Sequence, residues 1–179
     1  MPEIEIRPAV PQDIPLLVEI EHHTQSNYVW QMDRVVNEGE INIHFREIRL
    51  PRAVRIEYPR KPASLLTQWT QRTQVLVAAI EGMPVGYIGL SDQQAPSTAW
   101  VNDLAVRPEL RRKGIASALV LASQEWAIQR GLRRMILEMQ SKNHAAVRLA
   151  LKLGFEFGGY SDHYYSNQDI ALFFATYLR

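Results

Sequence analysis

The sequence has 179 residues with 20 basic and 19 acidic side chains, which gives a formal net charge of +1. That length suits one domain, and a content of 46% hydrophobic and 22% charged residues excludes disordered and collagen-like chains. The lack of cysteine excludes disulfides, thiolate metal sites and a cysteine nucleophile, and it favours a reducing cytoplasm.

The first half of the chain predicts a strand, a helix and a basic segment of less regular structure. Residues 1–7 alternate acidic and apolar side chains, which is typical of a strand and not of a secretory signal. An apolar run that follows predicts a helix over 14–20. The elaborated basic segment at about 27–70 predicts a strand near 40–49, within a hairpin or irregular region, and then a short helix over 62–69.

The second half of the chain alternates strands and helices. Its longest apolar-rich stretch, 114–126, is too short and too polar to span a bilayer, so we expect no membrane partner. Alternating elements predict parallel neighbours and hairpins predict antiparallel ones, so we expect one mixed α/β domain over 1–179. The elements expected here are a hairpin of strands 74–80 and 85–90, a strand over 98–106, a helix over 114–130, a strand over 135–139, a helix over 143–153, and strands over 155–160 and 170–177.

One loop between a predicted strand and a predicted helix carries the chemistry. It contains three adjacent cations, Arg111, Arg112 and Lys113, and then Gly114 at the start of the helix. Backbone amides at a helix N-terminus, a glycine that allows close approach and local positive charge together favour a pyrophosphate group. The alternative is a basic helix start that is merely solvated.

In its context this loop resembles part of a known family. Arg111-Arg112-Lys113-Gly114-Ile115-Ala116 is similar to the Arg/Gln-x-x-Gly-x-Gly/Ala pyrophosphate loop of the GNAT superfamily of N-acetyltransferases. The run Asp103–Pro108 resembles the bulged strand of that family. The run Asn143–Phe155 resembles its Asn-x-x-Ala-x-x-x-Tyr-x-x-x-Gly-Phe motif. The three motifs occur in the family's order and cover about residues 98–160.

The resemblance implies a single GNAT-like domain. Its central sheet would be mixed and mostly antiparallel, splayed into a V between two parallel strands and flanked by helices. Acetyl-coenzyme A (acetyl-CoA) would bind in the opening as cosubstrate, and an amine would attack it directly in a ternary complex. The implied cofactor-binding residues are Leu104, Ala105, Val106, Arg111, Arg112, Lys113, Gly114, Ile115, Ala116 and Asn143.

The residue that would protonate the leaving thiolate departs from the family pattern. The position that usually carries tyrosine is Ala150 in this chain. Tyr160, Tyr164 or Tyr165 could supply a catalytic hydroxyl instead, or they could serve only as aromatic walls of a pocket.

The amine must be neutral to attack, so the site also needs a proton acceptor. Asp103 is the first candidate because it precedes the expected bulge, although strand alternation also allows it to face away as a structural anion. Glu138 on the neighbouring strand is the second candidate, and an ion pair with Arg133 or Arg134 is its alternative role. Asn143 could bind the cofactor or simply cap a helix.

Two other functions stay open. The alanine at position 150 is compatible with a non-catalytic acyl-CoA-binding domain. The basic run 44–61 is most simply a solvated face, but it could recruit an acidic substrate, a protein or RNA, so an RNA-binding module is the other alternative. The near-neutral net charge disfavours nucleic acid, and the histidine spacing predicts no metal. An amine acceptor, small molecule or protein, is the expected partner, and a homodimer is compatible with the sequence.

Overall fold

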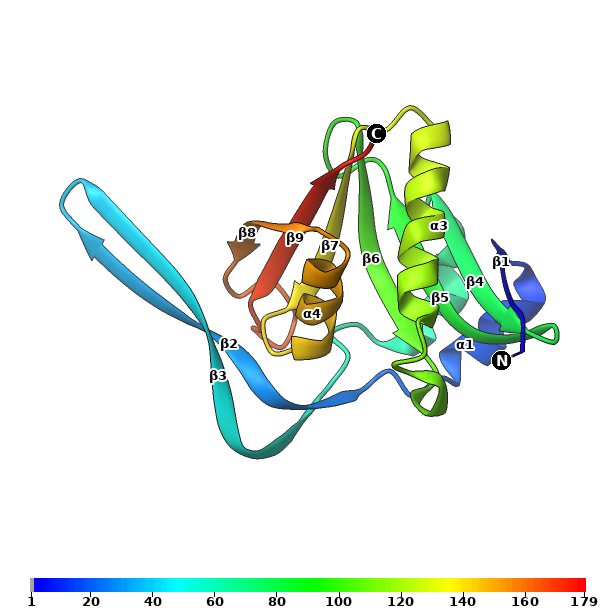
Figure 1. Cartoon of the computed structure of the whole chain (residues 1–179), viewed down its shortest axis with the longest axis horizontal. Helices are drawn as coiled ribbons and strands as arrows, with labels where there is room; N and C mark the ends of the chain where they lie inside the picture. Colours follow the sequence, from blue (N-terminus) through cyan, green and yellow to red (C-terminus); the bar gives the residue numbers. More distant parts are fainter. Residues whose placement is uncertain (1) are drawn as a thin grey trace.

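A seven-stranded sheet forms the centre of the molecule in a computed structural model that describes residues 2–179 (Figure 1). The strand order is β1-β4-β5-β6-β7-β9-β8. Strands β6 and β7 run parallel, and each of the other neighbouring pairs is antiparallel. The bounds are β1 Ile4–Pro8, β4 Gln74–Ile80, β5 Met83–Ser91, β6 Thr98–Val106, β7 Arg134–Gln140, β8 Glu156–Ser161 and β9 Ala171–Tyr177.

The parallel pair opens along its length. Strands β6 and β7 pair from Thr98 with Arg134 to Val101 with Leu137, and their pairing ends there although both strands continue. On its other edge β6 stays paired with β5, where a register shift makes Asn102 an extra residue. A bulge of this kind bends and twists its strand. The predicted mixed α/β fold with a sheet splayed between two parallel strands is therefore confirmed.

Helices cover both faces of the sheet. Leu119 and Val120 of α3 pack into one apolar cluster with Leu137 of β7, and Leu17 of α1 and Leu65 of α2 pack into a second cluster against the opposite face. Figure 1 shows α3 and α4 on the near face. The bounds are α1 Ile14–Val18, α2 Leu65–Gln68, α3 Ile115–Gln129 and α4 His144–Lys152, with 3-10 turns at Pro11–Asp13, Pro62–Ser64, Trp69–Gln71 and Pro108–Leu110.

A long two-stranded ribbon forms the basic segment, which confirms the hairpin that the sequence allows there and excludes the irregular alternative. Its strands are β2, Thr24–Asn37, and β3, Glu40–Ile56, which pair antiparallel with one register shift between Ser26 and Tyr28. The strand expected near 40–49 lies within β3. The bounds of its partner strand β2 were not predicted, because most of the ribbon has no buried face and its sequence therefore lacks a strict apolar alternation.

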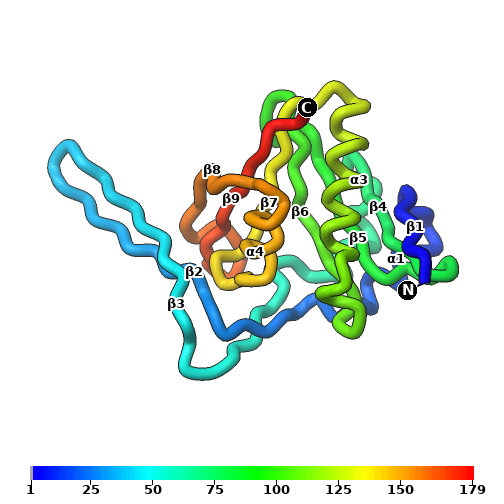
Figure 2. The backbone as a smooth tube through the Cα atoms, viewed as in Figure 1, coloured from blue at the N-terminus to red at the C-terminus, as the bar shows by residue number. Residues whose placement is uncertain are grey.

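The ribbon is attached to the body near its middle, and its tip projects away from the sheet (Figures 1 and 2). Phe45 of β3 packs against Phe157 and Tyr160 of β8, with ring centroids 5.5 and 5.3 Å apart. Tyr28 of β2 stacks on His144 at the start of α4. These contacts place the chain that follows β3 over the open part of the sheet, whereas the ribbon tip lies away from it.

A buried ion pair joins the first strand to the first turn of helix, and it predicts a pH-dependent stability. The Arg7 side chain donates two hydrogen bonds to Asp13, at 2.7 and 2.9 Å, and the Val10 amide donates a third at 2.8 Å. The hydrogen bond from Arg7 is the main cause that lowers the pKa of Asp13 from its usual 3.8. Because the folded-state pKa is depressed, this stabilisation is complete above pH 3.8 and is lost as the pH falls through the folded-state value.

We therefore expect Asp13→Asn to lower the free energy of unfolding by about 2 kcal/mol at neutral pH. The difference from the wild type should vanish in strong acid, as urea unfolding at a series of pH values would measure. Asp33→Asn is the matched control, because the Asp33–Arg46 pair is exposed on the ribbon and should contribute little. A difference that persists unchanged in acid would contradict this account of Asp13.

Candidate active site

An arginine lies between β6 and β7 at the first residue pair beyond the point where their pairing ends, a position that we call the open rung. Continuing the register, Asn102 of β6 and Glu138 of β7 would face each other next, but the sheet has parted there. The Arg60 guanidinium lies between them: Nη1 donates to the Asn102 carbonyl at 2.8 Å and Nη2 to Glu138 Oε1 at 2.5 Å. Its carbon atom Cζ also lies 5.5 Å from the centre of the Tyr165 ring. A cation thus bridges the two strands where their backbones no longer do.

Glu138 is a fully buried carboxylate with a complete set of partners. Its side chain is 0% exposed, and Oε2 accepts hydrogen bonds from Trp100 Nε1 at 2.7 Å and from the Tyr164 hydroxyl at 3.2 Å. Burial, and then the nearby Glu138 charge, raise the pKa of Tyr164, which keeps that hydroxyl protonated as a donor. The alternative prediction that Glu138 forms an ion pair with Arg133 or Arg134 was wrong. The partner is Arg60, 78 residues away along the chain.

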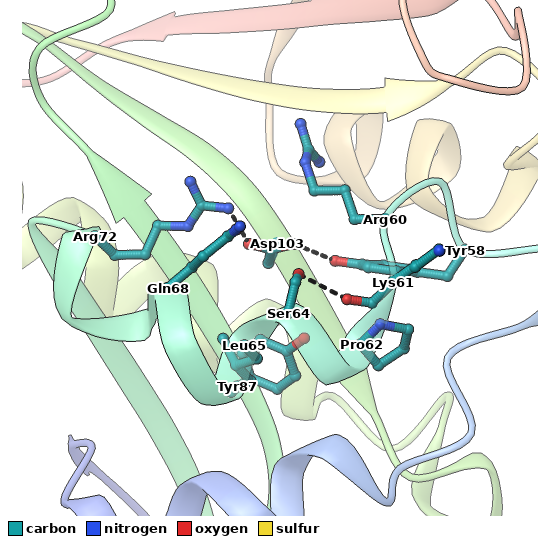
Figure 3. A pocket seen from close by; sticks show the side chains of 10 residues that line it. All are labelled: Tyr58, Arg60, Lys61, Pro62, Ser64, Leu65, Gln68, Arg72, Tyr87 and Asp103. Atoms are coloured by element: carbon teal, nitrogen blue, oxygen red, sulfur yellow. Dashed lines mark hydrogen bonds and ion pairs between the residues drawn. The ribbon is translucent and has the colours of Figure 1, made fainter.

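Asp103 lies on the face of the sheet that α1 and α2 cover. Before the bulge Val101 packs with α3, whereas after it Ala105 packs with α1 and α2, so the extra residue Asn102 reverses the alternation. Tyr58 donates to Asp103 Oδ1 at 2.5 Å and Arg72 to Oδ2 at 2.9 Å, from opposite sides (Figure 3). The two carboxylates Asp103 and Glu138 are each held by an arginine and a hydroxyl.

A small recess borders Asp103. Behind it, His22 contacts the Tyr87 hydroxyl at 2.9 Å and the Ile20 carbonyl at 2.6 Å. Burial lowers the pKa of His22 and raises those of Tyr58 and Tyr87, so these rings are neutral at physiological pH. The recess is lined by Tyr58, Arg60, Lys61, Pro62, Ser64, Leu65, Gln68, Arg72, Tyr87 and Asp103.

The predicted phosphate loop precedes α3 and is open to solvent. Gly114 adopts a left-handed φ of +87°, and a Cβ atom added there would meet nothing within 4 Å. The Ala118 amide donates to the Gly114 carbonyl at 2.9 Å, so the amides ahead of it form the free N-terminus of the helix. Arg112 and Lys113 are exposed beside this terminus. The loop therefore presents amides and two cations to solvent on one side.

Arg111 differs from its neighbours in the loop. Its guanidinium donates to the carbonyls of Val106 at 2.9 Å, His23 at 2.9 Å and Glu21 at 2.5 Å. Its burial lowers the pKa of this guanidinium. The side chain thus ties the loop to the segment between α1 and β2, and it does not project into solvent.

The remaining predicted residues lie around the split. Leu104, Ala105 and Val106 pair with β5, on the part of β6 that has parted from β7. Asn143 caps α4, with Oδ1 accepting from the Ala146 amide at 3.1 Å. Ile115 is buried at the start of α3, followed by Ala116.

The structure brings some candidate tyrosines to the rung and leaves another elsewhere. Tyr164 and Tyr165 lie beside Glu138 and Arg60, whereas Tyr160 packs edge-on against Phe45 of the ribbon. Ala150 lies on the fully buried face of α4 and presents no surface to the split. Sequence reasoning missed Tyr58, Arg60 and Arg72, which lie at or beyond the end of a basic run interpreted as solvated.

Two further features concern other site classes. Among residues 2–179, no three His, Asp or Glu side chains are grouped so as to hold a metal ion. None of the helices described is long and apolar enough to cross a membrane.

Comparison with known proteins agrees with this geometry. The sequence model of the acetyltransferase (GNAT) family matches residues 43–155. An uncharacterized N-acetyltransferase of Methanocaldococcus jannaschii is 31% identical over 85 residues, 45% of this chain and 38% of that protein. The chain spans about 38% to 60% of the length of the curated relatives it matches.

Two solved structures share the fold over almost the whole chain. Nourseothricin acetyltransferase has a TM-score of 0.83 at 21% identity, covering 98% of this chain and 99% of its own. A protein of Bacillus anthracis described as a putative streptothricin acetyltransferase, solved in complex with acetyl-CoA, has a TM-score of 0.75 at 18% identity, with coverage of 98% and 99%. Since the family match spans more than half of the sequence, the chain belongs to the GNAT family of acetyltransferases.

Proposed function

We propose that this protein transfers the acetyl group of acetyl-CoA to the nitrogen of an amine, by direct attack in a ternary complex. The observation that carries the proposal is the open rung at Asn102 and Glu138, on the same strand that leads into the exposed loop before α3. The rung offers a place for a thioester between two strands, and the loop offers a place for a pyrophosphate. The absence of cysteine is compatible with such a reaction in the cytoplasm.

The loop and the strand β6 would bind the cosubstrate. Arg112, Lys113 and the amides of 114–116 would hold the pyrophosphate, because a helix N-terminus and two cations favour phosphate oxygens. The backbone of 104–106 would pair with the pantetheine arm along the edge that β7 has left. Arg111 would act through its carbonyl contacts, by fixing the loop, and Asn143 would contribute at the N-terminus of α4.

Glu138 is our choice for the proton acceptor. It lies on the open rung, its side chain is buried, and three donors, Arg60, Trp100 and Tyr164, fix its position beside the gap between β6 and β7. It would take one proton from the nitrogen so that the neutral amine can attack, forming the carbon–nitrogen bond as the carbon–sulfur bond breaks. Tyr164 would protonate the leaving thiolate.

Asp103 is the other carboxylate of the site. It lies on the face that α1 and α2 cover and not between β6 and β7, and it binds Tyr58 and Arg72, so we assign it the positioning of these two side chains at the recess. Tyr160, which packs against Phe45, would form part of the wall on the ribbon side. Placement of thioester and amine would supply most of the acceleration.

Thiol release from acetyl-CoA tests the proposal. The purified chain should release free thiol only when an amine is added, with acetylated amine found by mass spectrometry. Initial rates at varied concentrations of both substrates should give intersecting lines, as a ternary complex requires. An acetylated protein formed without amine would contradict direct attack. Saturable acetyl-CoA binding without thiol release for any amine would favour the non-catalytic alternative.

A further inference from the structure

The guanidinium of Arg60 occupies a site built for a cation. A carboxylate oxygen of Glu138, the carbonyl of Asn102 and the face of the Tyr165 ring surround it. Anionic oxygens and aromatic faces are the groups that bind guanidinium and ammonium ions. In Figure 3 the Arg60 side chain points away from Asp103 and toward the strand β7. The guanidinium therefore faces away from Asp103, although the Arg60 side chain also lines the recess there.

Under the proposed function, the acceptor nitrogen has to reach this same place. The proton acceptor Glu138 lies on the open rung, and its Oε1 is bound by Arg60. The site is also balanced in charge: Glu138 faces Arg60, and Asp103 faces Arg72. An ammonium group that entered while both arginines stayed would add an unpaired positive charge to a largely buried site, which is costly.

The position of the Arg60 side chain allows it to leave the cation site. Glu138 is 0% exposed, whereas the Arg60 side chain is 28% exposed, so the guanidinium lies between the buried carboxylate and solvent. Arg60 belongs to the segment between β3 and the turn at Pro62–Ser64. That segment is anchored by other residues: Gln140 donates to the Glu57 carbonyl at 3.1 Å, and Tyr58 donates to Asp103. The Arg60 side chain can thus swing out while the segment stays in place.

We propose that Arg60 is a specificity-determining residue that occupies the cation site between turnovers, and that a cationic amine displaces it to bind Glu138 and the Asn102 carbonyl. This inference rests on the proposed function for the identity of the reaction. It names the acceptor class as an amine that arrives as an ammonium ion. The exchange of one cation for another keeps the charge of the site constant. The bound ammonium group then gives one proton to Glu138 and becomes the neutral amine that attacks, and the second proton passes to the leaving thiolate by way of Tyr164.

Arg60→Ala tests the cation site without any catalytic readout. Removal of the side chain leaves a cavity that free guanidinium ion should fill, so about 20 mM guanidinium chloride should raise the Tm of this variant relative to sodium chloride of equal concentration. The wild type should show no such rise, since Arg60 fills the site. Arg52→Ala is the matched control, because Arg52 is exposed on β3. A variant whose Tm does not rise would overturn the proposal.

A diamine tests the displacement. Calorimetry with 1,4-diaminobutane should give a Kd about tenfold lower for Arg60→Ala than for the wild type, because the resident guanidinium no longer competes. Weaker binding to the variant would mean that Arg60 anchors the acceptor, and equal binding would mean that the acceptor binds elsewhere; either result overturns the proposal. Arg60→Lys, which keeps the charge but cannot bridge two partners as a fork, should give an intermediate Kd.

The two proposals can fail separately. Binding of acetyl-CoA to each variant shows that it is folded, and neither the Tm shift nor the diamine titration requires turnover. If the wild type releases no thiol with any amine, the proposed acetyl transfer fails while the guanidinium result still decides whether the cation site exists. If thiol release is observed and the guanidinium effect is not, the role of Arg60 fails and the acetyl transfer stands.

Discussion

Replacement of Gly114 by aspartate is expected to abolish measurable binding of acetyl-CoA. The new carboxylate would lie at the N-terminus of α3, where it would accept hydrogen bonds from the amides that we assign to the pyrophosphate. It would also repel that group. Two like unit charges 4 Å apart near a protein surface repel each other by about 4 kcal/mol, which corresponds to roughly a thousandfold increase in Kd. Calorimetric titration with acetyl-CoA measures the effect.

A matched control separates this effect from backbone strain. Gly82 lies in the turn between β4 and β5, has a φ of +78° against +87° for Gly114, and likewise has open space where a Cβ would be. Gly82→Asp therefore introduces the same charge and the same strain away from the loop. We expect it to bind acetyl-CoA as the wild type does. Unchanged affinity in Gly114→Asp would remove the loop from the binding site.

Replacement of Glu138 by glutamine is expected to lower kcat/KM by about 10²- to 10⁴-fold, the usual contribution of a general base. Glutamine has nearly the same shape, and its oxygen can still accept from Trp100 Nε1, but it cannot take the proton of the amine. The Kd of acetyl-CoA should stay the same, because the loop before α3 is untouched. Thiol release measured at saturating and limiting amine gives both kinetic parameters.

Asp103→Asn provides the comparison for Glu138→Gln. Since Asp103 is assigned to hold Tyr58 and Arg72, we expect its loss to raise KM for the amine more than it lowers kcat. If Asp103→Asn instead lowers kcat strongly while Glu138→Gln retains most of the wild-type kcat, Asp103 is the base and the assignment of Glu138 is wrong.

Most elements of the second half of the chain could be predicted from the sequence because they have a buried face. Strand β7 and helix α4 were expected within one or two residues of their bounds, and the motif loop lies before α3 as predicted. The ribbon could be predicted only in part, since half of the β2 residues are exposed and its contacts with the body involve few residues, such as Tyr28. The alternation of apolar and polar residues in a strand reflects the burial of one face, so a strand without a buried face shows little alternation in its sequence.

The partners in the site could not be read from the sequence for two physical reasons. A bulge at Asn102 reverses the strand alternation, so a strict period of two leaves the direction of Asp103 undecided. The arginine that binds Glu138 lies 78 residues earlier, at the end of a basic run whose other members include exposed arginines. The charge pattern of the sequence shows that arginines are present, but only the folded structure shows which arginine contacts the sheet.

Calorimetric titration with acetyl-CoA, compared with adenosine diphosphate, tests most directly the claim that this cosubstrate binds along the split between β6 and β7. The account predicts saturable binding of acetyl-CoA at one site per chain, with a lower Kd than that of adenosine diphosphate, because the pantetheine arm adds contacts with the free edge of β6. Equal Kd values for the two ligands would contradict the role of that edge. The absence of binding would contradict the site as a whole.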